Sequence, residues 1–280
     1  MELGEAFHRT AATATTGGKS RRDSFTPRLG HRSTSILRYG DQLAGRSRAI
    51  EARHVRDVSG NRHLPRYRWT DPASTPSYRI GIFAGIHGDE QSGVIAAVQL
   101  LHHLERHPMI GRFHEVFIYP LCNPWGFDQG LREGASGRDL NRLFWQEEAE
   151  VLLIEQELRA KRFDGIIALH TDDTSEGIYG YVNGSTLTRH LLEPSLDAAS
   201  SILPRDHRPE IDTHPAERSI ITGGYTGILS APPDQHPKPF EIVFETPHLA
   251  PLGRQVEAHL AAVKEILRLF PQISSQGMDI

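Results

Sequence analysis

Four short apolar runs, each rich in β-branched or aromatic residues, constrain the fold of this 280-residue chain more than any other feature. Runs this apolar suit strands that are covered on both faces, as in the central sheet of an α/β protein. Stretches with helical periodicity separate them, and strands that alternate with helices predict a largely parallel sheet. The expected strands are YRIGIFAGI (78–86), EVFIYPL (115–121), DGIIAL (164–169) and FEIVF (240–244), and the expected helices cover residues 91–107, 147–162, 186–202 and 253–270.

We therefore expect one α/β domain over residues 36–280, with a mixed, mostly parallel sheet flanked by helices. Its first segment, ILRYGDQLAGRSRAIEARHV (36–55), resembles two short strands around a glycine-containing turn. Residues 1–35 are rich in Ser, Thr, Gly and Arg and have no apolar period. Such a segment cannot bury enough apolar surface to offset its ordering entropy, so we expect a disordered or surface-bound arm.

Composition indicates a soluble globular protein, with 38% hydrophobic and 24% charged residues. The sequence contains no run of 18 apolar residues, so no membrane-spanning helix is expected. The N-terminus lacks the apolar core of a secretory signal. Cys122 is the single cysteine, which favours a reducing, cytoplasmic location. Basic residues outnumber acidic ones in residues 1–70, but no nucleic-acid-binding motif accompanies them. We expect neither a nucleic-acid nor a membrane partner, and no oligomeric state is indicated.

The spacing His-x-x-Glu is typical of metal ligands, but it is weakly specific in a chain with 16 histidines. Ordinary surface residues explain most such pairs. Only His87 and Glu90 lie where an apolar strand ends and a helix begins, which is the open edge of an α/β sheet where ligands usually bind. The pattern occurs at His87/Glu90, His102/Glu105, His190/Glu193, His207/Glu210 and His214/Glu217.

Three other expected strands also end on polar residues. DGIIAL is followed by His170, FEIVF by Glu245, and EVFIYPL by Asn123 one residue further on. Parallel strands place these ends along one edge, so we expect the side chains to meet there. Two neutral imidazoles and one carboxylate can fill three of the four tetrahedral positions of zinc and leave one for water. A strand end that needed only a polar cap would not require His or Glu.

These residues lie in motifs that resemble the zinc carboxypeptidase family and its relatives, the succinylglutamate desuccinylase/aspartoacylase group. Any single motif is weak, but together they are specific. The resemblance implies a zinc carboxypeptidase-like fold and one Zn²⁺ per chain. The matching motifs, in the order of the family, are YGDQLAGRSRAI (39–50), HGDE (87–90), NPWGFDQGLREGASGRDLNR (123–142), ALHTDD (168–173) and FETP (244–247).

The resemblance implies a metal centre in which His87, Glu90 and His170 ligate the zinc. Glu245 would be the general base that takes a proton from the zinc-bound water, and Asp139 would orient the His87 ring. A zinc ion lowers the pKa of its bound water to about 7, so hydroxide is available at neutral pH. A nearby carboxylate can then pass the proton to the leaving amine.

The resemblance also implies roles for several polar side chains in substrate recognition. Arg132 would polarise the scissile carbonyl, with Arg138 as a competitor for that role. Asn141 and Arg142 would hold the free carboxylate of the substrate, for which a guanidinium fork is suited. Alternatively, DLNR (139–142) is an Asp-capped helix start that carries ion pairs.

A tyrosine on a mobile loop is a further feature of the family. Tyr225 lies twenty residues before Glu245 in the Gly-rich stretch ITGGYTGIL, although a tyrosine in such a loop is unremarkable by itself. Asp172 and Asp173 follow His170 and either shape the pocket or cap a turn.

Peptidases and N-acyl amino acid hydrolases share all of these residues. The acylase relatives usually carry a further β-rich domain after the base, whereas 35 residues follow Glu245 in this sequence. The expected function is therefore a zinc-dependent metallocarboxypeptidase that releases the C-terminal amino acid of a peptide, with a cell-wall-type peptide as one candidate. The alternatives are an N-acyl amino acid amidohydrolase and a catalytically silent binding module of the same fold.

Overall fold

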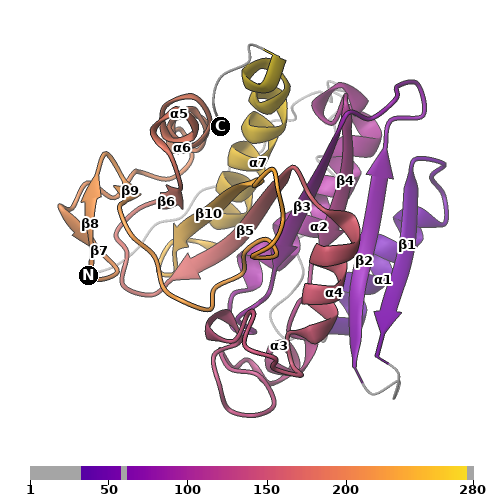
Figure 1. The fold of residues 1–280 in the computed structure, drawn as a ribbon, viewed down its shortest axis with the longest axis horizontal. Coiled ribbons are helices and arrows are strands. Elements are labelled where there is room, and N and C mark those ends of the chain that lie inside the picture. Colours follow the sequence, from indigo (N-terminus) through magenta and orange to yellow (C-terminus); the bar gives the residue numbers. More distant parts are fainter. Residues whose placement is uncertain (1–32, 58–61, 276–280) are drawn as a thin grey trace, which may run out of the picture.

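The computed structural model describes residues 33–57 and 62–275, and its strands form a single sheet (Figure 1). The strand order is β1-β2-β4-β3-β5-β10-β6-β9-β8-β7. The strands are β1 (Ile50–Arg56), β2 (His63–Thr70), β3 (Tyr78–Ala84), β4 (His114–Tyr119), β5 (Gly165–Asp172), β6 (Tyr179–Val182), β7 (Glu210–Ile211), β8 (His214–Glu217), β9 (Ile220–Ile221) and β10 (Phe240–Pro247). The α-helices are α1 (Ser33–Ala44), α2 (Gln91–Arg106), α3 (Pro124–Gln129), α4 (Leu152–Lys161), α5 (Ser185–Leu187), α6 (Glu193–Ser200) and α7 (Leu252–Ser275).

The four apolar runs form the middle of the sheet. Strands β4, β3, β5 and β10 are neighbours and run parallel. Antiparallel pairs add β2 and β1 on one side and β6 on the other. The prediction of a mixed, mostly parallel sheet flanked by helices is therefore confirmed.

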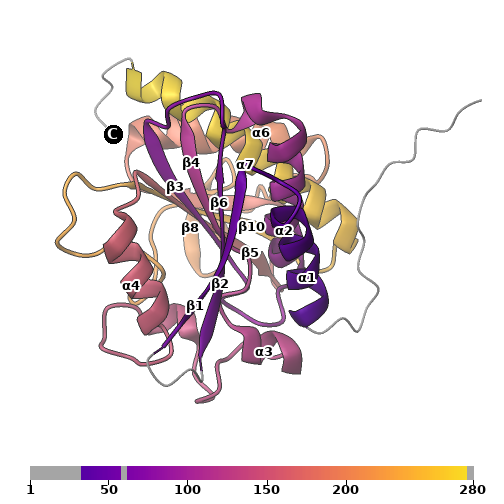
Figure 2. The same cartoon turned by 90° about the vertical axis from the view of Figure 1, so that its right-hand side faces the viewer.

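Helices cover both faces of this sheet (Figure 2). Helices α1, α2, α6 and α7 lie on one face and α4 lies on the other. The central strands alternate between the two layers because successive side chains of a strand point to opposite faces. In β5, for example, Ile167 and Leu169 belong to the apolar core under α2 and α7, whereas Ile166 and Ala168 belong to the core under α4.

The first described segment differs from its prediction. Residues 36–44 were expected to form a strand, but they belong to helix α1, and only β1 is a strand. Ile36, Leu37 and Gly40 are buried on one face of this helix, and the Tyr67 hydroxyl donates to the Leu37 carbonyl at 3.0 Å. The spacing of three and four residues between these positions suits a helix packed on a sheet. Of the predicted N-terminal arm, residues 1–32 lie outside the described residues and Ser33–Ser35 begin α1.

The later helices follow the prediction with shifted boundaries. The stretch expected at 147–162 becomes helical only at Leu152, and the stretch at 186–202 is divided among α5, a π-helical turn (Thr188–Leu192) and α6. None of the described helices is both long enough and apolar enough to span a bilayer.

A buried ion pair joins α4 to the sheet. Arg66 of β2 is 4% exposed and donates to the Glu157 carboxylate of α4 at 2.9 Å. The Tyr119 hydroxyl of β4 donates to the same carboxylate at 2.7 Å. A charge taken out of water requires such partners, because its desolvation is otherwise uncompensated.

We expect Glu157→Ala to lower the free energy of unfolding by about 3–5 kcal/mol, because it removes the carboxylate that accepts a hydrogen bond from the buried Arg66 guanidinium and leaves the Glu51 carboxylate, at 3.9 Å, as a more distant partner. Chemical denaturation measures this change. Asp234→Ala is the matched control, because it removes the exposed partner of Arg159, an ion pair of 2.9 Å on the surface. That control is expected to cost less than about 1 kcal/mol, and equal losses in the two variants would contradict the assignment.

Candidate metal centre and substrate pocket

Three segments bring His87, Glu90 and His170 together at the carboxyl edge of the parallel strands. His87 follows the end of β3 by three residues, Glu90 immediately precedes α2, and His170 lies in β5. One donor atom from each residue lies within 4.8 Å of the others, and all three side chains are buried. Within residues 33–57 and 62–275, no other group of three or more His, Cys, Asp or Glu side chains is placed to share a metal ion.

The Glu90 carboxylate lies between the two imidazoles. Its Oε2 is 2.9 Å from Nδ1 of His170, and its Oε1 contacts Nδ1 of His87. The backbone N–H of Thr171 also donates to Oε2 at 3.1 Å. Burial alone would raise the pKa of Glu90, but the positive potential of His170 and His87 outweighs it and holds this pKa well below its usual range. Both imidazoles therefore direct Nδ1 toward the ionised carboxylate of Glu90.

The second ring nitrogen of His87 is held by Asp139. Nε2 of His87 lies 3.0 Å from Oδ1 of Asp139, which also accepts the backbone N–H of Asn141 at 2.8 Å. Burial disfavours the charged ring, but Glu90 and Asp139 outweigh it and raise the pKa of His87 to about 9. Carboxylates that hold a proton on this ring also favour a metal cation in place of that proton. The Asp139 contact places the Nε2–H toward Asp139, so Nδ1, which faces the Glu90 carboxylate, is the ring nitrogen that could ligate a metal.

Of the two candidate arginines, Arg132 reaches the cluster. Its guanidinium lies 3.1 Å from Asp139 and 3.5 Å from Glu90. Arg138 is exposed instead and makes two hydrogen bonds to Glu148, at 2.7 and 2.6 Å. Arg132 therefore lies beside the carboxylates of the cluster, and Arg138 pairs with Glu148 instead.

Glu245 lies next to the metal-ligand cluster because of strand register. It pairs with His170 across β10 and β5, and with Tyr179 across β10 and β6. Its carboxylate lines the same pocket as the two histidines. Burial, followed by the negative charges of Glu90 and Asp172, raises the pKa of Glu245 well above its ordinary value. A carboxylate with a raised pKa is better suited to accept and release a proton near neutral pH.

The pocket beside this cluster has a volume of about 70 Å³ and contains the predicted substrate-binding residues. The Arg142 guanidinium lies over the Tyr225 ring, 4.0 Å from its centroid. The Tyr225 hydroxyl donates to the carbonyl of Asp212 at 3.0 Å. Asn141 is buried, and its side-chain oxygen accepts the backbone N–H of Leu229 at 2.9 Å. Arg142, Tyr225 and Asn141 thus border the same space as His87, His170 and Glu245.

Three polar side chains that line this pocket were not among the predicted site residues: Tyr179, Tyr181 and Asp212. They come from β6 and from the turn between β7 and β8, whose positions depend on pairing with distant strands. No local sequence signal places them at the site. The sequence left open whether Asp172 and Asp173 shape the pocket or cap a turn. The Asp172 carboxylate accepts the backbone N–H of Thr174 within a turn, and it also accepts the hydroxyl of the pocket residue Tyr179 at 2.9 Å. The Asp173 side chain is exposed.

The fourth strand end does not contribute to the metal-ligand cluster. Asn123 caps helix α3, where its side-chain oxygen accepts the backbone N–H of Gly126 and its amide donates to the carbonyl of Glu133, both at 2.9 Å. An asparagine is a strong helix N-cap, and this requirement explains its presence. Of the four strand ends, those that lead to His87, His170 and Glu245 line one pocket, and the one that leads to Asn123 does not.

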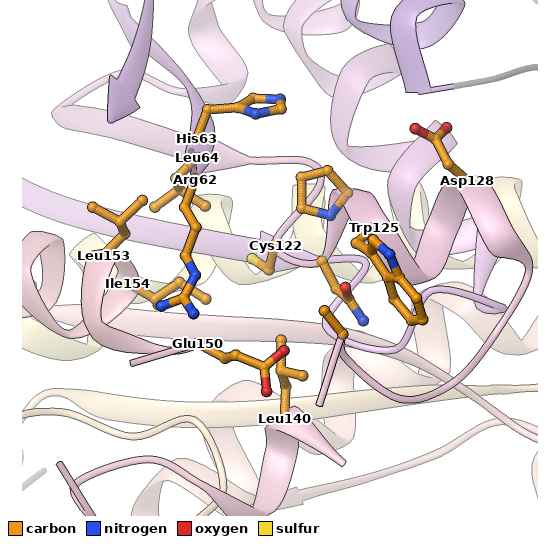
Figure 3. Close-up of a pocket in the computed structure, with 13 residues that line it drawn as sticks. Arg62, His63, Leu64, Cys122, Trp125, Asp128, Leu140, Glu150, Leu153 and Ile154 are labelled. Carbon is orange, nitrogen blue, oxygen red and sulfur yellow. The ribbon is translucent and has the colours of Figure 1, made fainter. Parts of the chain in front are cut away.

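A second pocket, of about 410 Å³, lies between residues of β2, of α4 and of the segment 123–142 (Figure 3). Trp125 and Arg62 flank it, and the Cys122 thiol lies between them in this view. Burial raises the pKa of this thiol, so it remains protonated. Most of the remaining lining is apolar, including Leu64, Leu140, Leu153 and Ile154. This pocket contains none of the predicted site residues.

Comparisons with known proteins agree with the motifs. Residues 76–202 match the model of the succinylglutamate desuccinylase/aspartoacylase catalytic domain. Murein peptide amidase A of Escherichia coli (strain K12) is 44% identical over 82 residues, which are 27% of this chain and 31% of that protein. The chain thus aligns with less than a third of the length of this curated relative.

Solved structures share the fold of this chain at low sequence identity. A protein from Shewanella denitrificans assigned as a metallopeptidase has a TM-score of 0.68 at 23% identity and covers 84% of this chain and 87% of its own. A metallo-carboxypeptidase from Pseudomonas aeruginosa has a TM-score of 0.64 at 17% identity, with 87% and 70% covered. Bovine thrombin-activatable fibrinolysis inhibitor also has a TM-score of 0.64 at 15% identity, with 88% and 98% covered. These likenesses confirm the carboxypeptidase-like fold.

A close backbone approach holds the segment 123–142 against the HGDE turn. A Cβ atom on Gly88 would lie 2.0 Å from the carbonyl carbon of Gly126, so only glycine fits. We expect Gly88→Ala to lower the free energy of unfolding by about 1–3 kcal/mol, as overpacking does. Denaturation measures the loss. Gly253→Ala is the control, because a Cβ there meets no atom within 4 Å. Equal stability of the two variants would contradict the close approach.

Proposed function

We propose that this protein is a zinc-dependent hydrolase of the metallocarboxypeptidase type, which releases the C-terminal amino acid of a peptide. The observation that carries this proposal is the shared pocket. The buried His87–Glu90–His170 cluster borders the same space as a carboxylate with a raised pKa, Glu245, and as the guanidinium of Arg142.

The residues of the cluster fit zinc. Two imidazole nitrogens and one carboxylate are the protein ligands of several catalytic zinc sites. Asp139 supports the assignment, because a carboxylate on the second ring nitrogen of a histidine fixes the tautomer that a metal requires. A bound zinc ion would supply a Lewis acid for a substrate carbonyl and would lower the pKa of water.

The remaining steps belong to side chains of this chain. The Glu245 carboxylate would take a proton from the attacking water and pass it to the leaving amine. This role requires a Glu245 pKa near the working pH. Arg132 would stabilise the negative charge that develops on the carbonyl oxygen. Its guanidinium lies beside Glu90, a proposed metal ligand, and is therefore close to where a substrate carbonyl would bind. Arg142, with Asn141 and Tyr225, would hold the free carboxylate of the substrate.

The comparisons favour a peptide as substrate. The name of the curated relative specifies an amidase of murein peptides, which supports a cell-wall-type peptide for this chain. The carboxypeptidases among the solved structures support a substrate with a free C-terminal carboxylate. The second candidate is an N-acyl amino acid, because the matched family model is that of the succinylglutamate desuccinylases and aspartoacylases.

We expect Glu245→Gln to lower kcat by about 10²- to 10⁴-fold, as loss of a general base does, and to leave one zinc ion bound per chain. His170→Ala is the matched variant, and it is expected to lose the metal. Turnover of peptide substrates and metal content by atomic absorption give the two readouts. Full activity of Glu245→Gln would remove this residue from the role, and unchanged zinc content in His170→Ala would refute the ligand assignment.

We expect Arg142→Ala to lower kcat/KM by about 10- to 100-fold on substrates with a free carboxylate. This loss corresponds to one hydrogen bond between charged groups, which contributes about 1.5–3 kcal/mol. The loss should be smaller on the same peptides with an amidated C-terminus. A panel of dipeptides, longer peptides and N-acyl amino acids then separates the two substrate classes. Equal losses on amidated substrates would contradict the carboxylate contact, and bound zinc with no turnover on the whole panel would favour a silent binding module.

A further inference from the structure

Behind the metal-ligand cluster, four polar side chains are buried in the apolar layer under α2 and α7. Ser92 comes from α2, Thr171 from β5, Thr246 from β10 and His259 from α7. Their exposed fractions are 1%, 7%, 0% and 0% in that order. A buried polar group without a partner costs about 1–3 kcal/mol, so four such groups in an apolar layer require an explanation.

These four side chains form a closed ring of hydrogen bonds. The Ser92 hydroxyl lies 2.8 Å from that of Thr171, which lies 3.3 Å from that of Thr246. Nε2 of His259 lies 3.2 Å from the Ser92 hydroxyl and 3.2 Å from the Thr246 hydroxyl. Elements that are distant in sequence are thus joined at one point. We call this set of four residues the hydroxyl–imidazole ring.

Three of the four ring residues lie within two positions of a residue of the proposed catalytic site. Ser92 follows Glu90 by two residues, Thr171 follows His170 directly, and Thr246 follows Glu245 directly. Because side chains alternate along a strand, Thr171 and Thr246 point to the α2/α7 face while their neighbours point to the pocket. Thr171 also donates its backbone N–H to the Glu90 carboxylate at 3.1 Å.

The hydrogens of the ring can be assigned by counting donors. Burial lowers the pKa of His259 to about 3, so the imidazole is neutral and carries one N–H. Nδ1 has no partner in the described part of the chain, and a buried N–H without a partner is rarer than a bare acceptor, so the hydrogen is placed on Nε2. The Nε2–H of His259 is then shared between the hydroxyl oxygens of Ser92 and Thr246. The hydroxyl hydrogens run from Ser92 to Thr171, from Thr171 to Thr246, and from Thr246 to the carbonyl of His170 at 3.5 Å.

We propose that His259 is a positioning residue, which through this ring fixes the relative placement of Glu90, His170 and Glu245. This inference rests on the proposed function. His259 touches none of the reacting groups and acts through the three hydroxyls. An aliphatic side chain would fill the same site without an unpaired nitrogen, so packing alone does not account for the imidazole.

We expect His259→Leu to weaken binding of Zn²⁺ and Co²⁺ by about 10-fold or more, as loss of the outer hydrogen bonds of a metal site does. The visible absorption spectrum of the cobalt-loaded variant should also change, because ligand geometry determines it. His259→Gln retains an N–H donor and should restore both properties toward those of the wild type. Competition with a chelator measures the affinities, so the test does not depend on turnover.

The matched control is His114→Leu. His114 of β4 is also buried, at 1% exposed, and its Nε2 donates to the Leu267 carbonyl of α7 at 2.7 Å, at the opposite end of the parallel strands. This variant should lose stability but retain the metal affinity and the cobalt spectrum of the wild type. If His259→Leu fails to fold, Thr246→Val, with Thr246→Ser as its conservative partner, tests the same ring.

The outcomes separate this inference from the proposed function. A wild-type chain that binds metal, with unchanged affinity and spectrum in both His259→Leu and Thr246→Val, would overturn the positioning role and leave the metal site intact. Equal effects of His114→Leu and His259→Leu on metal affinity would overturn it also, because general destabilisation would then suffice. A wild-type chain that binds neither ion would overturn both proposals.

Discussion

The buried carboxylate of Glu90 is the group on which the arrangement of the site depends. A negative charge in an apolar interior requires positive or hydrogen-bonding partners. The chain supplies them from positions up to 81 residues away from Glu90, in the form of His87, His170 and the backbone N–H of Thr171. Asp139 then compensates His87 from its other side, and Arg132 compensates both carboxylates. The turn after β3, the end of β5 and the segment 123–142 are therefore placed by the requirements of one charge as well as by apolar packing.

The sequence predicted the middle of the fold and the proximity of His87, Glu90 and His170 because both depend on local patterns. Apolar runs identify strands without knowledge of their neighbours, and parallel strands bring their carboxyl ends to one edge. His87, His170 and Glu245 could thus be placed near one another from strand ends alone. The contacts of Asp139 with His87 and of Arg142 with the pocket were expected only from the family motifs, since no local pattern joins positions so distant in sequence.

Other parts could not be read from local patterns. Residues 36–44 have too few apolar positions to distinguish a short helix from a strand, and the sheet beneath them decides in favour of α1. Tyr179 and Asp212 reach the pocket through the pairing of β6 and the turn after β7, which are tertiary events. His259 has the sequence context of a polar residue on an amphipathic helix, whereas the structure buries it completely. Asn123 also follows a strand end, but its side chain caps α3, and a strand-end pattern alone does not distinguish a helix cap from a pocket residue.

The stacked pair of Arg142 and Tyr225 has a thermodynamic consequence for recognition. The aromatic ring occupies the flat face of the guanidinium, whereas an anion binds to the in-plane N–H groups at its edge, so the two contacts are compatible. A long arginine side chain usually loses considerable rotamer freedom when it binds a ligand. Here the Tyr225 ring already restricts that freedom, so much of the entropic cost of the proposed carboxylate contact would be met during folding.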